Sequence, residues 1–124
     1  MLKIKRVYEA ADDDDGLRVL IDRLWPRGLS KDAAHVDLWL KEVAPSTELR
    51  KWFAHDPNKW AVFQQRYVAE LQGQSEALSQ LRTQTRKGRL TLLYGAKDEA
   101  HNNAMVLKTL LETPSGARQR CAPH

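Results

Sequence analysis

The sequence predicts an α/β fold, a three-layer single domain in which helices flank a short, mainly parallel sheet of about four strands. Two nearly continuous apolar runs, residues 17–24 and 90–94, are typical of strands that are covered on both faces. Other segments place apolar residues at spacings of three and four, which indicates amphipathic helices packed on that sheet. With 124 residues, 42% of them hydrophobic, the chain is large enough to bury a core.

The first part of the chain predicts strands joined by polar turns. Residues 2–8 alternate loosely and indicate a strand, and the loop 9–16 follows, in which four consecutive Asp residues are expected to face solvent rather than bind a cation. Strand 17–24 is expected to end before Pro26, because proline fixes its own φ and restricts Trp25. Ser30 is predicted to cap a short helical turn over 31–34, and the alternation at 36–40 indicates a half-buried or edge strand.

The second part predicts four helices and one strand. Ser46 is expected to cap a helix through residue 53, and Asp56 to cap a second helix that begins with Pro57. Gly73 permits a break before a helix over 76–86, and strand 90–94 follows Gly88. A last helix is predicted from about residue 99 to 111. Residues 1–113 are expected to form the domain and residues 114–124 a disordered tail.

Charged side chains follow the two apolar strands, where ligands bind in open α/β sheets. Arginine binds carboxylate or phosphate groups through two parallel hydrogen bonds. If the strands are parallel neighbours, these side chains converge; the alternative is that Arg23 pairs with an acid and Trp25 belongs to the core. The predicted anion-binding residues are Arg23, Arg27, Lys97 and Asn102, and the supporting residues are Trp25, Gly28, Ser46, Arg50, Tyr94 and Asp98, the last as cap of the final helix.

His101 is the candidate catalytic residue, because an imidazole can act as general acid or base near neutral pH. The alternative is that His101 is a solvent-facing or capping histidine in the first turn of the last helix. His55, next to Asp56, is a second histidine that lies beside an acidic residue. Neither a G-x-G-x-x-G sequence nor a P-loop occurs, which argues against a standard nucleotide site. No metal and no cofactor are predicted, because the histidines are far apart and Cys121 is the single cysteine.

The formal charge of +4 includes Arg118 and Arg120 in the predicted tail, and 18 basic and 16 acidic side chains remain without residues 114–124. Because Asp12 to Asp15 concentrate negative charge in one loop, the rest of the body is more basic than the total suggests. A small anionic ligand is therefore the first expected partner. The first hypothesis is a small enzyme, or a degenerate enzyme, that binds a phosphorylated or nucleotide-like molecule. Two alternatives remain open. One is nucleic-acid binding through the tail and the basic end of helix 76–86. The other is protein interaction, in which the chain is either a monomer or a homodimer formed through exposed Trp39 or Trp60. No apolar run approaches membrane length and no signal region follows Met1, so a cytoplasmic protein without membrane contact is expected.

Several short segments with unusual spacing resemble one known family. They are DRLWPRG at 22–28, APSTELR at 44–50, WFAHDP at 52–57, LLYGAKD at 92–98 and HNNA at 101–104. Together they resemble the YeaO-like proteins, a bacterial family built on domain of unknown function 488. The resemblance extends from about Lys5 to Leu111, excludes the residues after Thr113, and implies no particular reaction.

Overall fold

The computed structural model describes residues 2–54, 56–97 and 101–112. Its strands are β1 (Leu2–Arg6), β2 (Leu17–Leu20), β3 (Leu38–Trp39) and β4 (Leu90–Tyr94), and its α-helices are α1 (Lys31–Ala34), α2 (Thr47–Phe53), α3 (Trp60–Leu71), α4 (Ser75–Lys87) and α5 (Asn103–Glu112). Four short 3-10 helices lie at Asp13–Asp15, Lys41–Val43, Pro57–Lys59 and Gln72–Gln74. The predicted tail, His55 and Asp98 lie outside the described residues.

The four described strands form one sheet in the order β1-β4-β2-β3, and every neighbouring pair is parallel. The α/β prediction is therefore confirmed. Strand β4 lies between β1 and β2, so the second predicted apolar strand is the neighbour of the first. This order brings the carboxyl ends of β2 and β4 to the same edge of the sheet.

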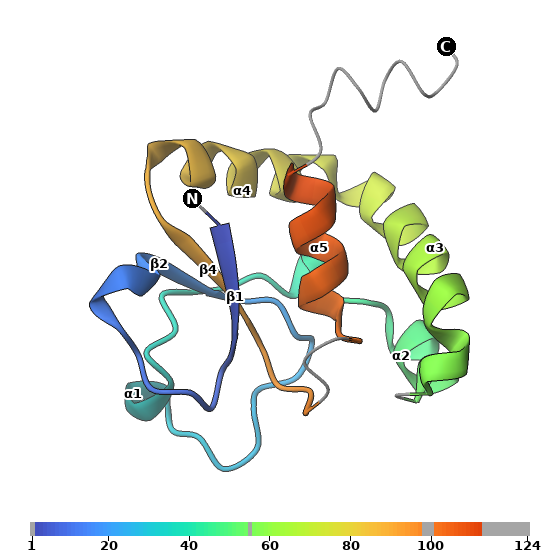
Figure 1. The fold of residues 1–124 in the computed structure, drawn as a ribbon, viewed down its shortest axis with the longest axis horizontal. Helices are drawn as coiled ribbons and strands as arrows, with labels where there is room; N and C mark the ends of the chain where they lie inside the picture. Colours follow the sequence, from blue (N-terminus) through green and yellow to red (C-terminus); the bar gives the residue numbers. More distant parts are fainter. Residues whose placement is uncertain (1, 55, 98–100, 113–124) are drawn as a thin grey trace.

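The two faces of the sheet are covered unequally (Figure 1). Helices α2 to α5 pack on one face around Val19, Ile21 and Leu92, and their side chains form the larger core. The other face is covered by the connection between β2 and β3, which contains α1 and encloses a smaller core around Leu20 and Leu93. Because successive strand residues point to opposite faces, the apolar residues of β2 and of β4 are divided between the two cores.

Strand β2 ends earlier than the apolar run predicted. It stops at Leu20, and Leu24 is 59% exposed instead of buried. The backbone leaves the sheet because side chains, not a neighbouring strand, bind its last carbonyls: Asn103 Nδ2 donates to Ile21 O (3.1 Å) and Trp39 Nε1 donates to Asp22 O (2.7 Å). Arg23 thus leaves the sheet and donates to the carbonyls of Ala44 and Pro45 just before α2, whereas Trp25 packs against the smaller core.

The loop before β2 corrects the expectation of four solvated aspartates. Asp12 to Asp14 are exposed, but Asp15 is 1% exposed. Its carboxylate contacts Lys3 (2.8 Å), Lys5 (3.1 Å) and Arg18, and its carbonyl accepts a hydrogen bond from Thr91 Oγ1 (2.7 Å). Asp15 therefore ties the loop to three strands, because each of its partners lies on β1, β2 or β4.

The predicted helix starts are confirmed at two places. Ser30 Oγ accepts a hydrogen bond from Ala33 N at the start of α1, and Ser46 Oγ accepts one from Leu49 N at the start of α2. Asp56 caps a 3-10 turn, Pro57–Lys59, which leads into α3. Helix α5 begins at Asn103, and Asn102 Oδ1 accepts from Met105 N (3.0 Å), so Asn102 takes the capping position predicted for Asp98.

Candidate functional site

A cavity of about 220 Å³ lies where β2 and β4 end, and we call it the strand-end cavity. Its wall combines residues that follow both strands with residues from α2, α3 and the start of α5. The residues that line it are Asp22, Arg23, Leu24, Pro45, Arg50, Phe53, Phe63, Gly95, Ala96, His101, Asn102 and Asn103. Segments far apart in the chain meet here because β4 pairs with β2 and α5 packs on β4.

The carboxylate of Asp22 holds the ends of the two strands together. Its Oδ2 accepts a hydrogen bond from Gly95 N (2.7 Å), and its Oδ1 accepts one from Asn103 Nδ2 (3.0 Å). Gly95 allows this approach, since a Cβ there would lie 3.1 Å from Asp22 Oδ2. Asp22 therefore joins the turn after β4 and the start of α5 to the end of β2.

Two guanidinium groups line the cavity from different elements. Arg23 Nε donates to Pro45 O (3.2 Å) and Arg23 Nη2 donates to Ala44 O (3.3 Å), which fixes the direction of the half-buried side chain. Arg50 is exposed and lies on α2. Among the described residues, no carboxylate forms an ion pair with either arginine. Their positive charges are therefore not neutralised by the described protein groups.

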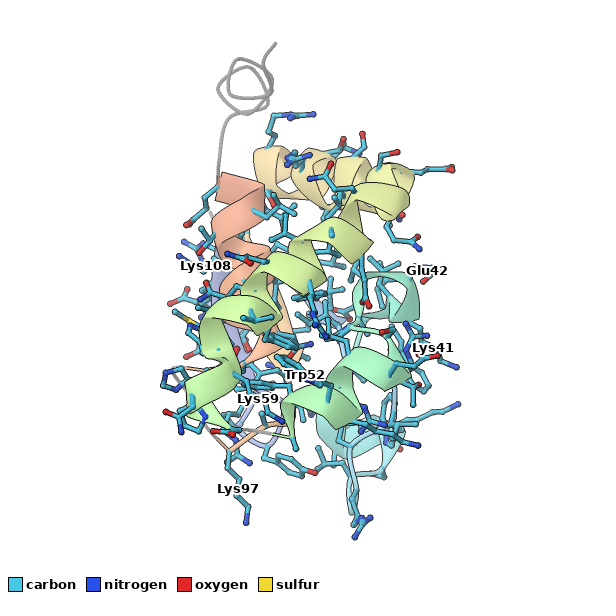
Figure 2. The ribbon with its side chains drawn as sticks, turned by 90° about the vertical axis from the view of Figure 1, so that its right-hand side faces the viewer. Lys41, Glu42, Trp52, Lys59, Lys97 and Lys108 are labelled. Carbon is cyan, nitrogen blue, oxygen red and sulfur yellow. The ribbon has the colours of Figure 1, made fainter. Side chains whose placement is uncertain are left out.

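Helix α2, which carries Arg50, is held in place by its packing on α3. Two cations contact the Trp52 ring: Lys59 Nζ lies 5.0 Å from its centroid (Figure 2), and Arg66 Cζ lies 4.5 Å from it. Lys59 Nζ also donates to Trp52 O (2.8 Å). These contacts fix the last turn of α2, so Arg50 extends from an anchored helix.

One side of the cavity is aromatic and apolar. Phe53 and Phe63 stack with ring centroids 4.3 Å apart, and Trp60 stacks on Phe63 at 5.6 Å. The His101 imidazole meets the Trp60 ring edge-on at 5.1 Å. Because both phenylalanines also line the cavity, a ligand there meets a hydrocarbon surface as well as the arginines.

A buried tyrosine lies in the same part of the core. Tyr67 is completely buried, and its hydroxyl donates to the Val43 carbonyl. Burial, followed by the negative charges of Asp22 and Glu70, raises the pKa of Tyr67 far above its usual value. Tyr67 therefore stays neutral and serves as a hydrogen-bond donor in the core.

The structure brings some of the predicted site residues to the strand-end cavity and leaves others outside its lining. Arg23, Asn102, Arg50 and His101 line it. Arg27 and Lys97 are exposed and do not, and Figure 2 shows Lys97 extending away from the body of the molecule. Of the supporting residues, Trp25, Gly28, Ser46 and Tyr94 lie outside the lining. Asp98 and His55 cannot be placed, because they lie outside the described residues.

Three backbone N–H groups near the cavity have acceptors within the protein. The start of α2 is closed by a carboxylate, because Ser46 N donates to Glu70 Oε1 (2.8 Å) and Ser46 Oγ bonds to Glu70 Oε2. Met105 N is bound by the Asn102 side chain, and Gly95 N by Asp22. His101 and Asn102 precede α5 rather than lying in its first turn, which corrects the predicted start.

Sequence reasoning missed Asn103 and the two phenylalanines as parts of the site. The DRLW segment pointed to the region, but the hydrogen bond between Asp22 and Asn103 joins residues that are distant in sequence. Phe53 and Phe63 belong to the larger core and also line the cavity. No sequence signal separates an aromatic residue that is only in the core from one that also borders a cavity.

Some of the described groups behind the two alternative functions make contacts within the protein, and others, such as Lys87, are exposed. At the basic end of α4, Arg89 pairs with Asp14 (2.8 Å) and Arg82 Nη2 donates to Leu110 O (3.3 Å). Trp39 and Trp60, which were expected to be exposed, are half-buried. The Trp39 ring packs edge-on against Trp25 at 5.3 Å.

Two kinds of feature are absent from the described residues. In the described part of the chain, no group of three or more His, Cys, Asp or Glu side chains is arranged to hold a metal ion. None of the helices in residues 2–54, 56–97 and 101–112 has the length and apolar content that crossing a membrane requires.

Comparison with known proteins gives a family and no function. Residues 1–123 match the family model DUF488-N3i, described as "Inactive DUF488-N3 subclade". The chain is 44% identical over 112 residues to the uncharacterized protein YeaO of Escherichia coli, covering 90% of this chain and 97% of that protein. It is also 44% identical over 110 residues to the uncharacterized protein Rv3073c of Mycobacterium tuberculosis, covering 89% and 92% of the two chains. No solved structure matches the chain.

Proposed function

The chain belongs to the DUF488 family, as a YeaO-like member of its inactive N3 subclade, and from that premise we propose that it binds a small anionic molecule in the strand-end cavity without transforming it. The observation that carries this proposal is the pair of arginines, Arg23 and Arg50, on the wall of one cavity. Both lack a carboxylate partner among the described residues.

The contacts of Arg23 support an anion-binding role. Its described partners, the carbonyls of Ala44 and Pro45, are neutral, so they orient the guanidinium without cancelling its charge. A guanidinium has five N–H donors, so the two hydrogen bonds to these carbonyls leave other donors for a ligand. A planar, pre-oriented guanidinium suits a carboxylate or a phosphate, which it can bind through two parallel hydrogen bonds.

The size of the cavity supports a small ligand. Pockets for drug-sized ligands usually measure about 300–1,000 Å³. The strand-end cavity, at about 220 Å³, lies below that range. A metabolite of a few carbon atoms fits this volume, whereas a dinucleotide does not.

Binding without chemistry is favoured by what the lining contains. Among the described lining residues there is no Ser, Thr, Cys, Lys or Tyr to act as a nucleophile. Asp22 is engaged in holding the strand ends, through Gly95 and Asn103. His101 packs against Trp60, and its role as a general acid or base stays a prediction. The family description "inactive" agrees with a binding role.

The test is a panel of small anions measured by calorimetry and by chemical shifts, with one variant and a matched control. Arg50→Ala removes a cavity arginine, and Lys51→Ala removes the same charge from the next residue of α2, which is exposed and outside the lining. We expect Arg50→Ala to weaken binding about tenfold or more, because a hydrogen bond to a charged group contributes about 1.5–3 kcal/mol. Lys51→Ala should stay within twofold of the parent.

Two outcomes would contradict the proposal. One is that no anion of the panel binds at millimolar concentration; the other is that Arg50→Ala and Lys51→Ala weaken binding equally, which would indicate general charge attraction. Arg27→Ala and Lys97→Ala belong in the same series, because they decide whether these two predicted anion ligands contribute from outside the cavity lining.

A further inference from the structure

We infer that Glu70 is a positioning residue of the strand-end cavity: it lies outside the described lining and holds in place the segment that supports both cavity arginines. This inference rests on the proposed function, because it concerns how Arg23 and Arg50 are presented to an anion. It is carried by the hydrogen bonds of residues 43–46, which we call the support segment.

The support segment contacts both arginines directly. Arg23 donates from Nε to Pro45 O (3.2 Å) and from Nη2 to Ala44 O (3.3 Å). Arg50 N donates to Ser46 O (2.9 Å) in the first turn of α2. Neighbouring residues of one segment therefore hold the side chain of one arginine and the backbone of the other, so a shift of this segment would move both guanidinium groups.

Helix α3 holds the support segment at two points. Glu70 Oε1 accepts a hydrogen bond from Ser46 N (2.8 Å), and Glu70 Oε2 accepts one from Ser46 Oγ (2.5 Å). One turn earlier in the helix, the Tyr67 hydroxyl donates to the Val43 carbonyl. Because residues 43–45 are buried, their polar groups depend on such protein partners rather than on water.

The bonding of Glu70 suits this holding role. Its carboxylate is half-buried and forms no ion pair among the described residues. Both of its oxygens bind donors of the same residue, Ser46, whose Oγ also accepts from Leu49 N (3.1 Å). Hydrogen bonds to an ionised acceptor are stronger than those between neutral groups. Glu70 thus fixes the point at which α2 begins.

The sign of the effect on binding separates positioning from simple electrostatics. Glu70 is bound to the segment that holds both arginines, so removing its negative charge raises the positive potential around them and favours anions. Loss of positioning has the opposite result, because an anion must then also order the arginine side chains when it binds. We therefore expect Glu70→Ala to weaken anion binding even though it makes the protein more positive.

The experiment is a calorimetric titration of inorganic phosphate and of propionate into the folded parent and three variants. Glu70→Ala should weaken binding of each probe that the parent binds by about threefold to tenfold, the range expected when a side chain must be ordered on binding. Glu70→Gln keeps an acceptor for Ser46 N and should recover part of this loss. It also keeps the test decisive if Glu70→Ala fails to fold.

Glu48→Ala is the matched control for the charge. Glu48 is exposed, lies on α2 and lines the same surface groove between α2 and α3 that Glu70 borders. Its removal takes away one carboxylate without touching the support segment. The affinity of Glu48→Ala should equal that of the parent or rise by up to about twofold.

A second readout needs no ligand. The Nε–H group of Arg23 is bound to Pro45 O, so its signal in hydrogen–nitrogen correlation spectra should be shifted from that of a solvent-exposed arginine. This signal should move toward the solvent-exposed position in Glu70→Ala and stay in place in Glu48→Ala. A loss of global stability alone would leave the signal of the folded protein unchanged.

The inference and the proposed function fail differently. If Glu70→Ala binds the probes as well as the parent does, or loses no more affinity than Glu48→Ala, the inference is wrong and the anion-binding function stands. A loss of affinity without movement of the Arg23 signal would also overturn the inference. If the signal moves but the parent binds no anion, Glu70 does position Arg23, and the proposed function is the part that is wrong.

Discussion

Two aspartates that look alike in sequence have different structural roles. Asp22 joins two strand ends through neutral donors, while Asp15 is surrounded by three cations. Burial by itself raises the pKa of Asp15, but hydrogen bonds from Lys3, from the backbone and from further cations hold it well below its usual range. The first aspartate thus shapes the cavity, and the second fastens the loop before β2.

Replacing Asp15 by Asn is expected to destabilise the protein by on the order of 3 kcal/mol at pH 7, because it leaves the buried Arg18 guanidinium without its counter-charge. Asp14→Asn is the matched control, since Asp14 is exposed and its pair with Arg89 contributes at most about 1 kcal/mol. Urea unfolding of the three proteins measures the difference. A loss below 1 kcal/mol in Asp15→Asn would show that the cluster is not a stabilising element.

The parent protein and Asp15→Asn should respond differently to acid. The folded pKa of Asp15 lies below the value of about 3.9 in an unfolded chain. Its carboxylate therefore stabilises the folded state above pH of about 4 and loses this contribution as the pH falls further through the folded pKa. We expect the stability difference between the parent and Asp15→Asn to shrink below pH 4. A difference that stays constant from pH 7 to pH 3 would contradict this.

At the scale of elements, the way each helix or strand ends decides what it presents. Strand β2 ends where side chains bind its carbonyls, which turns Arg23 toward the cavity. Helix α2 ends at Ala54, a residue in the left-handed region with φ 47°. Glycine is the usual residue there, because a Cβ is unfavourable at positive φ.

Ala54→Gly is therefore expected to raise the free energy of unfolding by up to about 1 kcal/mol, through relief of that backbone strain. Ala69→Gly, at an exposed position inside α3, serves as the control and should lower it by about 1 kcal/mol. Thermal unfolding of both variants shows whether each substitution raises or lowers the free energy of unfolding. If both variants are destabilised equally, the left-handed conformation at Ala54 carries no cost.

In the molecule as a whole, the sheet separates two cores of different size. Long helices cover one face, while a connection with only a one-turn helix, α1, covers the other. Even so, Leu92 on the first face and Leu93 on the second are both fully buried. The thin layer thus excludes water as completely as the thick one at these positions.

We expect Leu93→Ala and Leu92→Ala to cost similar amounts, each about 2–5 kcal/mol, because both side chains lose buried contacts and leave a cavity. Chemical denaturation with one common m-value measures both. If Leu93→Ala alone lowers the free energy of unfolding by less than 1 kcal/mol, the layer formed by residues 25–36 must close around the smaller side chain.

Local sequence patterns were enough to predict the fold class, the places of β2 and β4 in the chain and two capped helix starts, because these follow from apolar periodicity and from single side chains such as Ser30 and Ser46. The strand order, the burial of Asp15 and the membership of the cavity were decided only by the tertiary structure. Arg23 and Arg27 looked equivalent in sequence, yet only Arg23 lines the cavity. Hydrogen bonds between distant segments set these features: those from Asn103 to Ile21 O and from Trp39 to Asp22 O lie where β2 ends, and those to the carbonyls of Ala44 and Pro45 direct the Arg23 side chain.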